Sequence, residues 1–427
     1  MIIKNFAQLA KTEERKLALE MIDAGLAAID TQKIIKETIS LGKNELRVGN
    51  ESFSLNEIAR IFVVGVGKCA LSAAGALEEI LGRKLSGGIV IDVRSGKLNK
   101  IKTISGDHPM PSEKNVFATD EIIELLKNTS EKDLVIFIIS GGGSTLLCHP
   151  ENMTCLDEAE ILKYLYGSGA NIKKINTVRK HISTARGGFL AKYAYPARAI
   201  SLIFSDVPGD DLEFIASGPT VKDTTTVEDA KKIVDEFDLE KKTGLKKINL
   251  VETPKENKYF ENIKNILVVS NKVALEAMRE KAESAGFNAE IVTTTLSGES
   301  EDVGLEIAKK LHSEKDKTVL LYGGETVVTS HATGKGGRAQ ELALSAMRVL
   351  RDNELVIAVG SDGRDNTDFA GGLCDNITKM KAGELDLVPG DYLMENKSYY
   401  FFEKTGDYIE TGDTGRNVAD FVIAIKS

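Results

Sequence analysis

YGGETVVTSHATGKGGRAQEL, residues Tyr322–Leu342, joins a strand-like run to a helix-like run. The run KTVLLY at 317–322 predicts a buried strand, and the run at 340–350 predicts a helix. Between them stand glycines and charged residues: Gly323, Gly324, Glu325, Gly334, Lys335, Gly336, Gly337 and Arg338. Glycine lets a ligand approach the backbone, and a helix N-terminus offers free N–H groups. The segment therefore predicts a phosphate or carboxylate site at the end of a strand; the alternative is a glycine-rich hairpin turn with surface charges.

Length and composition indicate a globular protein of two domains. The chain has 427 residues, of which 42% are hydrophobic and 28% charged, and this length exceeds an ordinary single core. Its net charge of −9 argues against a nucleic-acid binder. No apolar run is long enough for a membrane span, and the start MIIKNFAQLAKTEERK becomes charged too soon for a signal peptide. We therefore expect a cytoplasmic protein, a monomer or homodimer that binds neither membrane nor nucleic acid.

The predicted alternation of strands and helices begins with a buried strand at Ile61–Val64, a tight turn and a helix from Lys68 to Leu81. The turn glycines Gly65 and Gly67 form half of a dinucleotide-binding fingerprint, but the third glycine and the P-loop spacing are both missing. A lysine at a helix start opposes the helix dipole, so Lys68 predicts an anionic ligand. The alternative is a solvated surface lysine.

A second glycine-rich turn follows the strand predicted at 134–139. Its small hydroxyls and N–H groups could cradle an anion; the residues are Ser140, Gly141, Gly142, Gly143 and Ser144. The spacing is not that of a GxSxG elbow, which disfavours a serine hydrolase. A passive tight turn is the alternative.

Two further segments offer polar side chains. The run Ile175–Ser183 predicts an amphipathic helix whose polar face carries Asn176 and Arg179, and the guanidinium could grip a carboxylate with two hydrogen bonds. Its alternative is a basic surface helix. His108 lies in a loop shaped by two prolines and could point at a site, or could simply be exposed.

Two acids occupy matching positions after buried strands. Asp206 follows the strand predicted at 199–204, and Asp362 follows the one at 355–359. The carboxyl end of such a strand is the usual place for a metal ligand or a base. The run from 361 to 372 is not an EF-hand, because glycine stands where the twelfth position needs Glu. The cysteines form no CxxC pair and the histidines are scattered, which argues against structural zinc.

Domain organisation follows from a change of composition. Residues 221–262 are rich in Lys, Glu and Asp and predict a helical connection, so we place the domains at 1–255 and 256–427. A second α/β series starts with a strand at Ile266–Val269, and the chain closes with strands at Tyr399–Glu403 and Phe421–Ile425. Anion loops beside acids and cations suit phosphoryl transfer with Mg²⁺. The residues alone thus predict a kinase or another phosphate-handling enzyme.

Short strings along nearly the whole chain resemble the glycerate 2-kinase family, whose C-terminal part is called the MOFRL domain. The strings are VGVGKCA at 64–70, HPMP at 108–111, SGGGS at 140–144, INTVRKHIS at 175–183, SDVPGD at 205–210, ASGPT at 216–220, GGET at 323–326, GKGGRAQE at 334–341 and GSDG at 360–363. The resemblance implies ATP-dependent phosphorylation of D-glycerate to 2-phosphoglycerate with a divalent metal. It also implies two three-layer α/β/α domains around a cleft, the first Rossmann-like with a mostly parallel sheet and the second with a mixed sheet.

The matching motifs imply roles for individual residues. Lys68, Asp206 and Arg338 are the expected catalytic residues: the two cations balance phosphoryl charge, and the acid holds metal or orients the glycerate hydroxyl. Substrate binding is expected of Arg179, His108, Ser140 and Asn176. Nucleotide contacts are expected of Gly65, Gly67, Gly141, Gly142, Gly143, Ser144, Gly323, Gly324, Lys335, Gly336 and Gly337. Metal contacts are expected of Asp206, Glu325 and Asp362.

The chain departs from the family pattern at Ala339, where Asn is usual, and at Asp413 and Arg416, where Pro and Thr are usual. These changes leave nucleotide or acceptor preference open. Two other functions also remain: a hydroxypyruvate reductase using NAD(P)H, and a non-catalytic binding protein for sugar acids or nucleotides. The broken fingerprint at Gly65 argues against the reductase. Asp92 as its acid lies about 25 residues after that turn, farther than the usual ~20.

Overall fold

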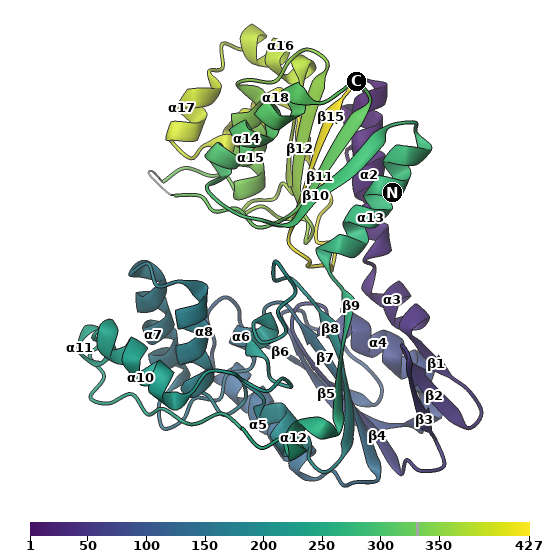
Figure 1. Ribbon diagram of the computed structural model, residues 1–427, viewed down its shortest axis with the longest axis vertical. Coiled ribbons are helices and arrows are strands. Elements are labelled where there is room, and N and C mark those ends of the chain that lie inside the picture. Colours follow the sequence, from purple (N-terminus) through teal and green to yellow (C-terminus); the bar gives the residue numbers. More distant parts are fainter. Residues whose placement is uncertain (330–332) are drawn as a thin grey trace. The chain divides into compact units, whose positions relative to one another are not determined.

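The computed structural model describes residues 1–329 and 333–427, which form two compact units. The parallel-sheet unit holds residues 31–205 and 210–268, and the mixed-sheet unit holds residues 1–30, 206–209 and 269–427. Each unit has a six-stranded sheet covered by helices (Figure 1), which confirms the predicted fold class. Among the described residues, no helix is both long and apolar enough to cross a bilayer.

The parallel sheet has the strand order of a Rossmann fold. Its strands are β4 (Arg60–Val66), β5 (Leu85–Asp92), β6 (Ile101–Ser105), β7 (Asp133–Ser140), β8 (Arg198–Phe204) and β9 (Ile263–Val269). They lie in the order β6-β5-β4-β7-β8-β9, which counted along the chain is 3-2-1-4-5-6. β7 reads DLVIFIIS and is buried throughout, as expected of a central parallel strand covered on both faces. The edge strand β9 includes Ile266–Val269, which the sequence assigned to the second series.

Helices cover both faces of this sheet. On one face lie α3 (Thr31–Thr38) and α4 (Ala70–Leu81), and on the other lies α5 (Glu113–Lys127) (Figure 1). Helix α9 (Phe189–Ala194) packs against α5 and β8. The short helix α6 (Gly143–Leu146) follows β7, and α12 (Lys258–Glu261) precedes β9. A small antiparallel sheet of β1 (Ile39–Leu41), β2 (Glu45–Val48) and β3 (Glu51–Ser54) sits beside α3 and α4.

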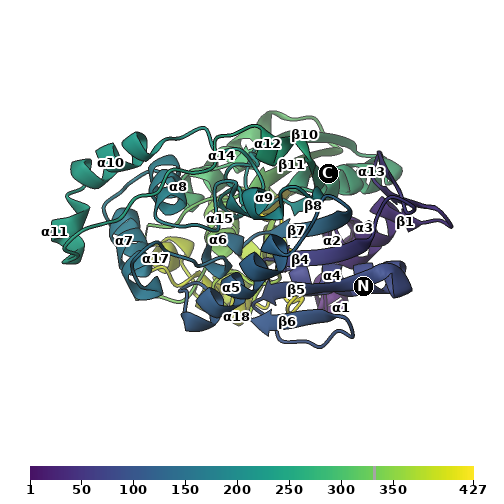
Figure 2. The same ribbon diagram turned by 90° about the horizontal axis from the view of Figure 1, so that it is seen from below.

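A group of four helices belongs to the same unit. These are α7 (Cys155–Gly167), α8 (Ile172–His181), α10 (Val227–Glu236) and α11 (Leu239–Thr243), and Figure 2 shows them gathered at one end of the sheet. Their apolar faces share one core that includes Leu165, Val178 and Ile233. The segment predicted as an interdomain connection is therefore partly a packed element, because α10 and α11 bury side chains against α7 and α8.

The mixed sheet has the order β10-β11-β15-β12-β13-β14. Its strands are β10 (Asn288–Leu296), β11 (Thr318–Gly324), β15 (Asp420–Lys426), β12 (Glu354–Gly360), β13 (Gly371–Cys374) and β14 (Tyr408–Ile409). Among the strands that the structure describes in this sheet, only β10 and β11 pair in parallel; the other pairs are antiparallel. One face carries α14 (Ser300–Ser313), α15 (Arg338–Met347), α17 (Pro389–Met394) and α18 (Ser398–Thr405), with α16 (Asn376–Glu384) nearby.

The N-terminal helices pack on the opposite face, which differs from the predicted boundaries. After α1 (Phe6–Leu9), helix α2 (Glu13–Ala28) lies along α13 (Asn271–Ser284) (Figure 1). The contact is close at Gly25, where an added Cβ would stand 2.3 Å from Cε of Met278. The apolar stripe of α2 thus packs against a helix from the second half of the chain. Residues 1–30 therefore belong to the mixed-sheet unit and not to the parallel-sheet unit.

A second difference concerns Tyr399–Glu403, which the sequence predicted as a strand. These residues lie in α18, where Phe401 and Phe402 enter the same core as α15. Aromatic residues favour strands because they fit a half-buried pleated surface, and here burial against helices satisfies them equally well.

Candidate active site

The turns after β4 and β7 lie side by side at the point where the strand order of the parallel sheet reverses. Open α/β sheets bind ligands at this switch point, outside the carboxyl ends of the strands. Gly67 has φ +118°, and a Cβ there would lie 2.1 Å from the hydroxyl of Ser140. The Lys68 N–H donates to the carbonyl of Gly141 at 2.9 Å. Glycine is required here because the two turns touch through their backbones.

The hydroxyl of Ser140 takes part in this contact. It donates to the carbonyl of Val66 and accepts from the N–H of Cys69, both at 3.3 Å. Gly65 packs against the neighbouring strand, since its Cβ would stand 3.0 Å from Val90. In this structure, Ser140 and Gly65 therefore shape the turn.

Lys68 and His108 both line Gly142. A Cβ on Gly142, which has φ +79°, would lie 3.2 Å from Cγ of Lys68 and 3.5 Å from Cδ2 of His108. Partial burial of the imidazole, and then the charge of Lys68, lower the pKa of His108 to about 4. The imidazole is thus neutral at pH 7 and adds no positive charge beside the lysine.

The other side of this turn carries polar side chains of α8. Ser144 Oγ lies 2.8 Å from the hydroxyl of Ser217, which donates to Asn176 Oδ1 at 3.3 Å. Arg179 donates to the same oxygen at 3.2 Å and to the hydroxyl of Tyr166 at 3.1 Å. The predicted polar face of α8 is therefore buried, and the alternative of a basic surface helix is wrong.

In the mixed-sheet unit, Arg338 stands at the first position of α15 and pairs with two carboxylates. Its Nε lies 2.5 Å from Oδ2 of Asp420, and its Nη2 lies 2.8 Å from Oε1 of Glu325. Burial alone would lower the pKa of Arg338, but these ion pairs raise it above its ordinary value. The guanidinium is therefore charged at every working pH. Burial raises the pKa of the Asp420 carboxyl to about 7.

The N-terminus of α15 differs from the anion site that the sequence predicted. The carboxylate of Asp365 accepts the N–H of Ala339 at 3.1 Å and of Gln340 at 2.8 Å. Gly337 leaves room for it, since a Cβ there would lie 2.2 Å from Asp365 Oδ1. A side chain of the protein itself therefore satisfies these N–H groups.

The other glycines of the opening segment also pack against protein. A Cβ on Gly334 would lie 2.1 Å from the carbonyl of Glu395, and one on Gly336 would lie 2.2 Å from Ser398 Oγ. In β11, a Cβ would lie 3.0 Å from Asn271 at Gly323 and 2.3 Å from Leu296 O at Gly324. Lys335 places its ammonium 3.5 Å from the centre of the Tyr399 ring. Residues 330–332 of this segment lie outside the described residues.

Asp206 and Asp362 both neighbour the loop at 413–417. Asp206 Oδ2 accepts from Asn417 Nδ2 at 3.1 Å. The carbonyl of Asp362 accepts from the Thr414 N–H at 3.1 Å, while its carboxylate accepts from the Arg364 N–H at 3.0 Å. The two acids therefore share a neighbouring loop, although the described residues contain no group of three or more His, Cys, Asp or Glu suited to a metal ion.

Sequence reasoning missed Asp420, Asp365, Asn417 and Ser217. Asp420 is visible only from the sheet, where it lies opposite Gly324 and Gly360 in register. Asp365 lies close to Asp362 in the acid-rich stretch 361–368, so its position in the sequence could have marked it as a candidate. Ser217 lies inside the string ASGPT, which had been noted without a role.

Comparison with known proteins identifies the family. Residues 17–252 match a domain of unknown function, DUF4147, and residues 318–420 match the MOFRL family. The glycerate 2-kinase of Pyrococcus horikoshii is 40% identical, over 96% of this chain and 97% of that protein. The chain belongs to the glycerate 2-kinase family. The resemblance predicted from short strings is thereby confirmed.

Two further similarities bear on function. The crystal structure of the glycerate kinase of Thermotoga maritima matches with a TM-score of 0.84 at 34% identity, over 96% of this chain and 99% of that one. A protein of Agrobacterium vitis named a putative hydroxypyruvate reductase is 36% identical, over 84% of this chain and 86% of its own length. The name of the Agrobacterium vitis protein corresponds to the hydroxypyruvate reductase alternative that the sequence left open.

Proposed function

We propose that this protein transfers a phosphoryl group from ATP to D-glycerate and forms 2-phosphoglycerate. The observation that carries the proposal is the match along nearly the whole chain to the Pyrococcus horikoshii protein named glycerate 2-kinase. The local geometry supports it, because a lysine beside a neutral histidine stands at the switch point of a Rossmann-ordered sheet.

The parallel-sheet unit supplies groups for phosphate and substrate. In our proposal, the ammonium of Lys68 and the N–H groups of residues 141–144 face phosphate oxygens. The guanidinium of Arg179 and the amide of Asn176 receive the carboxylate of the acceptor. His108, which is neutral at pH 7, donates a hydrogen bond without competing with Lys68 for negative charge.

Within the mixed-sheet unit, we propose roles for one cation and for an acid. Arg338 balances charge that develops on the transferred phosphoryl, and its pairs with Asp420 and Glu325 fix the plane of the guanidinium. Asp206 orients the acceptor hydroxyl and takes its proton.

Mg²⁺ remains a proposal, and the residues present fit a partial site. When bound, the ion would neutralise negative charge on the phosphates. Mg²⁺ commonly takes one or two carboxylates together with phosphate oxygens and water, so a cluster of three acidic ligands is not required. We propose that one or two of the carboxylates of Asp206, Asp362 and Glu325 hold it.

The reductase alternative is not favoured. A dinucleotide site needs an acid free to bind the ribose at the end of the second strand. Here Asp92 accepts the N–H of Leu71 at 2.9 Å and that of Arg94 at 3.0 Å, so its carboxylate is already engaged. A cytoplasmic location and a monomeric or homodimeric state stay predictions from the sequence.

The test is a coupled ADP-release assay over a panel of small hydroxy acids, run beside an NADH-oxidation assay with hydroxypyruvate. We expect ADP release that depends on D-glycerate, and no NADH oxidation. Glycerate binding without ADP release would favour the non-catalytic alternative, and NADH oxidation would favour the reductase.

A further inference from the structure

A strained turn stands beside the proposed substrate groups. Ala216 and Ser217 have φ of +50° and +59°, and Gly218 follows with +58°. The left-handed conformation is unfavourable for Ala and Ser because Cβ crowds a neighbouring carbonyl oxygen. Two such residues in succession persist only where their surroundings hold them, and residues of this kind gather at functional sites.

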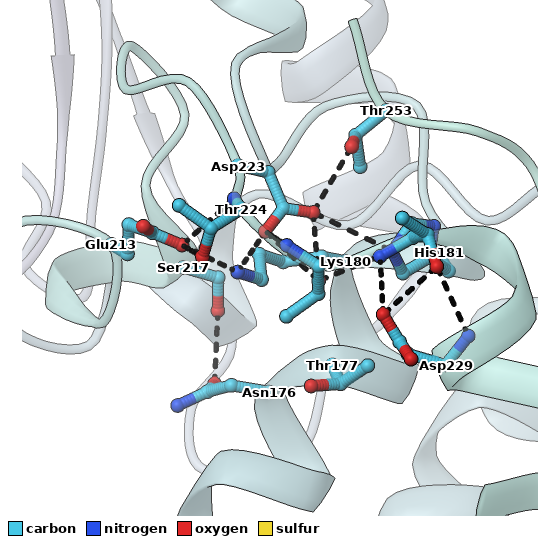
Figure 3. Close-up of polar contacts among 12 residues, drawn as sticks. Asn176, Thr177, Lys180, His181, Glu213, Ser217, Asp223, Thr224, Asp229 and Thr253 are labelled. Carbon is cyan, nitrogen blue, oxygen red and sulfur yellow. Dashed lines mark hydrogen bonds and ion pairs between the residues drawn. The ribbon is translucent and has the colours of Figure 1, made fainter. Parts of the chain in front are cut away.

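The hydroxyl of Ser217 bridges two parts of the proposed site. It lies 2.8 Å from Ser144 Oγ in the turn after β7. It also donates to Asn176 Oδ1 in α8 at 3.3 Å, a contact drawn in Figure 3. Because Asn176 Oδ1 also accepts from Arg179 at 3.2 Å, two donors fix the orientation of the amide. The NH₂ group of Asn176 is then turned away from Ser217 and can act as a donor elsewhere (Figure 3).

A second contact holds the strained turn against α8. Lys180, which is 4% exposed, pairs with Asp223 and lies 3.3 Å from Oε2 of Glu213. Asp223 also accepts from the hydroxyl of Thr253 at 3.0 Å (Figure 3). Glu213 and Asp223 flank the turn on either side, so these ion pairs tie both of its ends to the helix that carries Asn176 and Arg179.

Arg179 has a buried charge without a carboxylate partner. It is 9% exposed, its Nε has no hydrogen-bond partner, and no acid in the described parts of the chain lies within 4.0 Å of its guanidinium. The nearby Arg186 does have one, since it pairs with Glu158 at 2.6 Å. Burial lowers the pKa of Arg179, and the nearby Tyr166 and Glu158 offset only part of this effect. A buried cation of this kind is costly until an anion meets it, which points to an anionic ligand.

We propose that Ser217 is a positioning residue for the carboxylate of the hydroxy-acid substrate. Its hydroxyl holds Asn176, and through it Arg179, in the orientation that receives the carboxylate. The left-handed backbone at 216–217 is the conformation that puts this hydroxyl between Ser144 and Asn176. The inference rests on the proposed function and deepens it by adding a positioning residue to the proposed carboxylate subsite.

The test compares Ser217→Gly and Ser217→Ala with the natural protein. Both variants lose the hydroxyl, but only glycine also relieves the backbone strain. For both, we expect the KM and the directly titrated Kd for D-glycerate to rise about 3- to 10-fold, the effect of one neutral hydrogen bond. The KM for ATP should stay unchanged, and the Tm of Ser217→Gly should equal or exceed that of the natural protein.

Lys317→Gly is the matched control. Lys317 has the same φ of +59° but is exposed in the mixed-sheet unit. This variant should gain stability in the same way and keep the natural KM for D-glycerate. If Ser217→Gly also kept the natural KM and Kd for D-glycerate, or if both substrates were weakened equally, the inference would be overturned.

Failure of the proposed function would look different. A natural protein that binds D-glycerate but releases no ADP would refute the kinase proposal, and the Kd values would still test the role of Ser217. A natural protein that binds no hydroxy acid in the panel would overturn both.

Discussion

Arg15 offers a sharp test of how the N-terminal helix is held in the mixed-sheet unit. Its side chain is fully buried and donates to two acids: Nε and Nη2 to Asp375, both at 2.6 Å, and Nη1 to Asp407 at 2.8 Å. Asp407 would keep a second partner without it, because Lys381 Nζ lies 2.7 Å from the same carboxylate. Asp375 would lose its cation and keep its capping bonds from the Thr378 N–H at 3.0 Å and the Thr378 hydroxyl at 3.4 Å.

The expected cost of Arg15→Met follows from this difference. Breaking a buried pair from one side costs about 3–5 kcal/mol, because an uncompensated charge remains. One carboxylate rather than two is left without a cation, and it caps a helix N-terminus, so we expect the low end, about 3 kcal/mol. For a unit of this size, that corresponds to a fall in Tm of roughly 6–12 °C.

Scanning calorimetry and urea unfolding measure the effect, and Arg348→Met is the control. Arg348 pairs with Glu301 at 2.5 Å, but both side chains are over a third exposed, so its loss should cost less than about 1 kcal/mol. Adding Asp375→Asn to Arg15→Met should recover part of the loss, since the unpaired charge disappears. A cost for Arg15→Met no larger than that of the control would refute the assignment of residues 1–30 to this unit.

Three further predictions concern the proposed site. Lys68→Met should lower kcat/KM about 10²- to 10³-fold and raise the pKa of His108 from about 4, which NMR titration of the imidazole measures; an unchanged pKa would contradict their contact. Arg179→Met should raise the KM for D-glycerate about 10- to 100-fold with little change in the KM for ATP, and equal effects on both substrates would count against a carboxylate subsite. Asp420 has a folded pKa of about 7 against an unfolded value near 3.9, so the folded state binds the extra proton between these values. Its contribution to the stability of the mixed-sheet unit is present below about pH 4 and is lost as the pH rises through about 7. Urea unfolding at pH 5 and pH 8 tests this, and Asp420→Asn should flatten the difference.

The sequence predicted the two sheets well because their central strands are short apolar runs that end in glycine turns. β4, β7 and β11 were all placed in this way. The N-terminal helices could not be assigned to a unit from the sequence. The apolar stripe on α2 predicts that this helix packs against another element but does not identify that element. The strand predicted at Tyr399–Glu403 failed for a similar reason, since aromatic residues suit a helix face as well as a sheet.

The candidate site, like the fold, could be predicted from the sequence only in part. Lys68, His108, Asn176 and Arg179 were predicted from their positions at turns and on one helix face, and the structure brings the first two together beside Gly142. The free N–H groups expected at α15 could not be checked from sequence, because Asp365 reaches them from a loop about 25 residues further along the chain. Asp420 pairs with Arg338 across 82 positions, and only the strand register places it there.

The central claim is best tested by NMR of the product formed from ATP and D-glycerate. Phosphorus and carbon spectra identify which hydroxyl carries the phosphate. We expect 2-phosphoglycerate and ADP in equal amounts, with both formed about 10²- to 10³-fold more slowly by Lys68→Met. A product phosphorylated at the 3-position, or ATP that remains intact while D-glycerate is bound, would contradict the proposal.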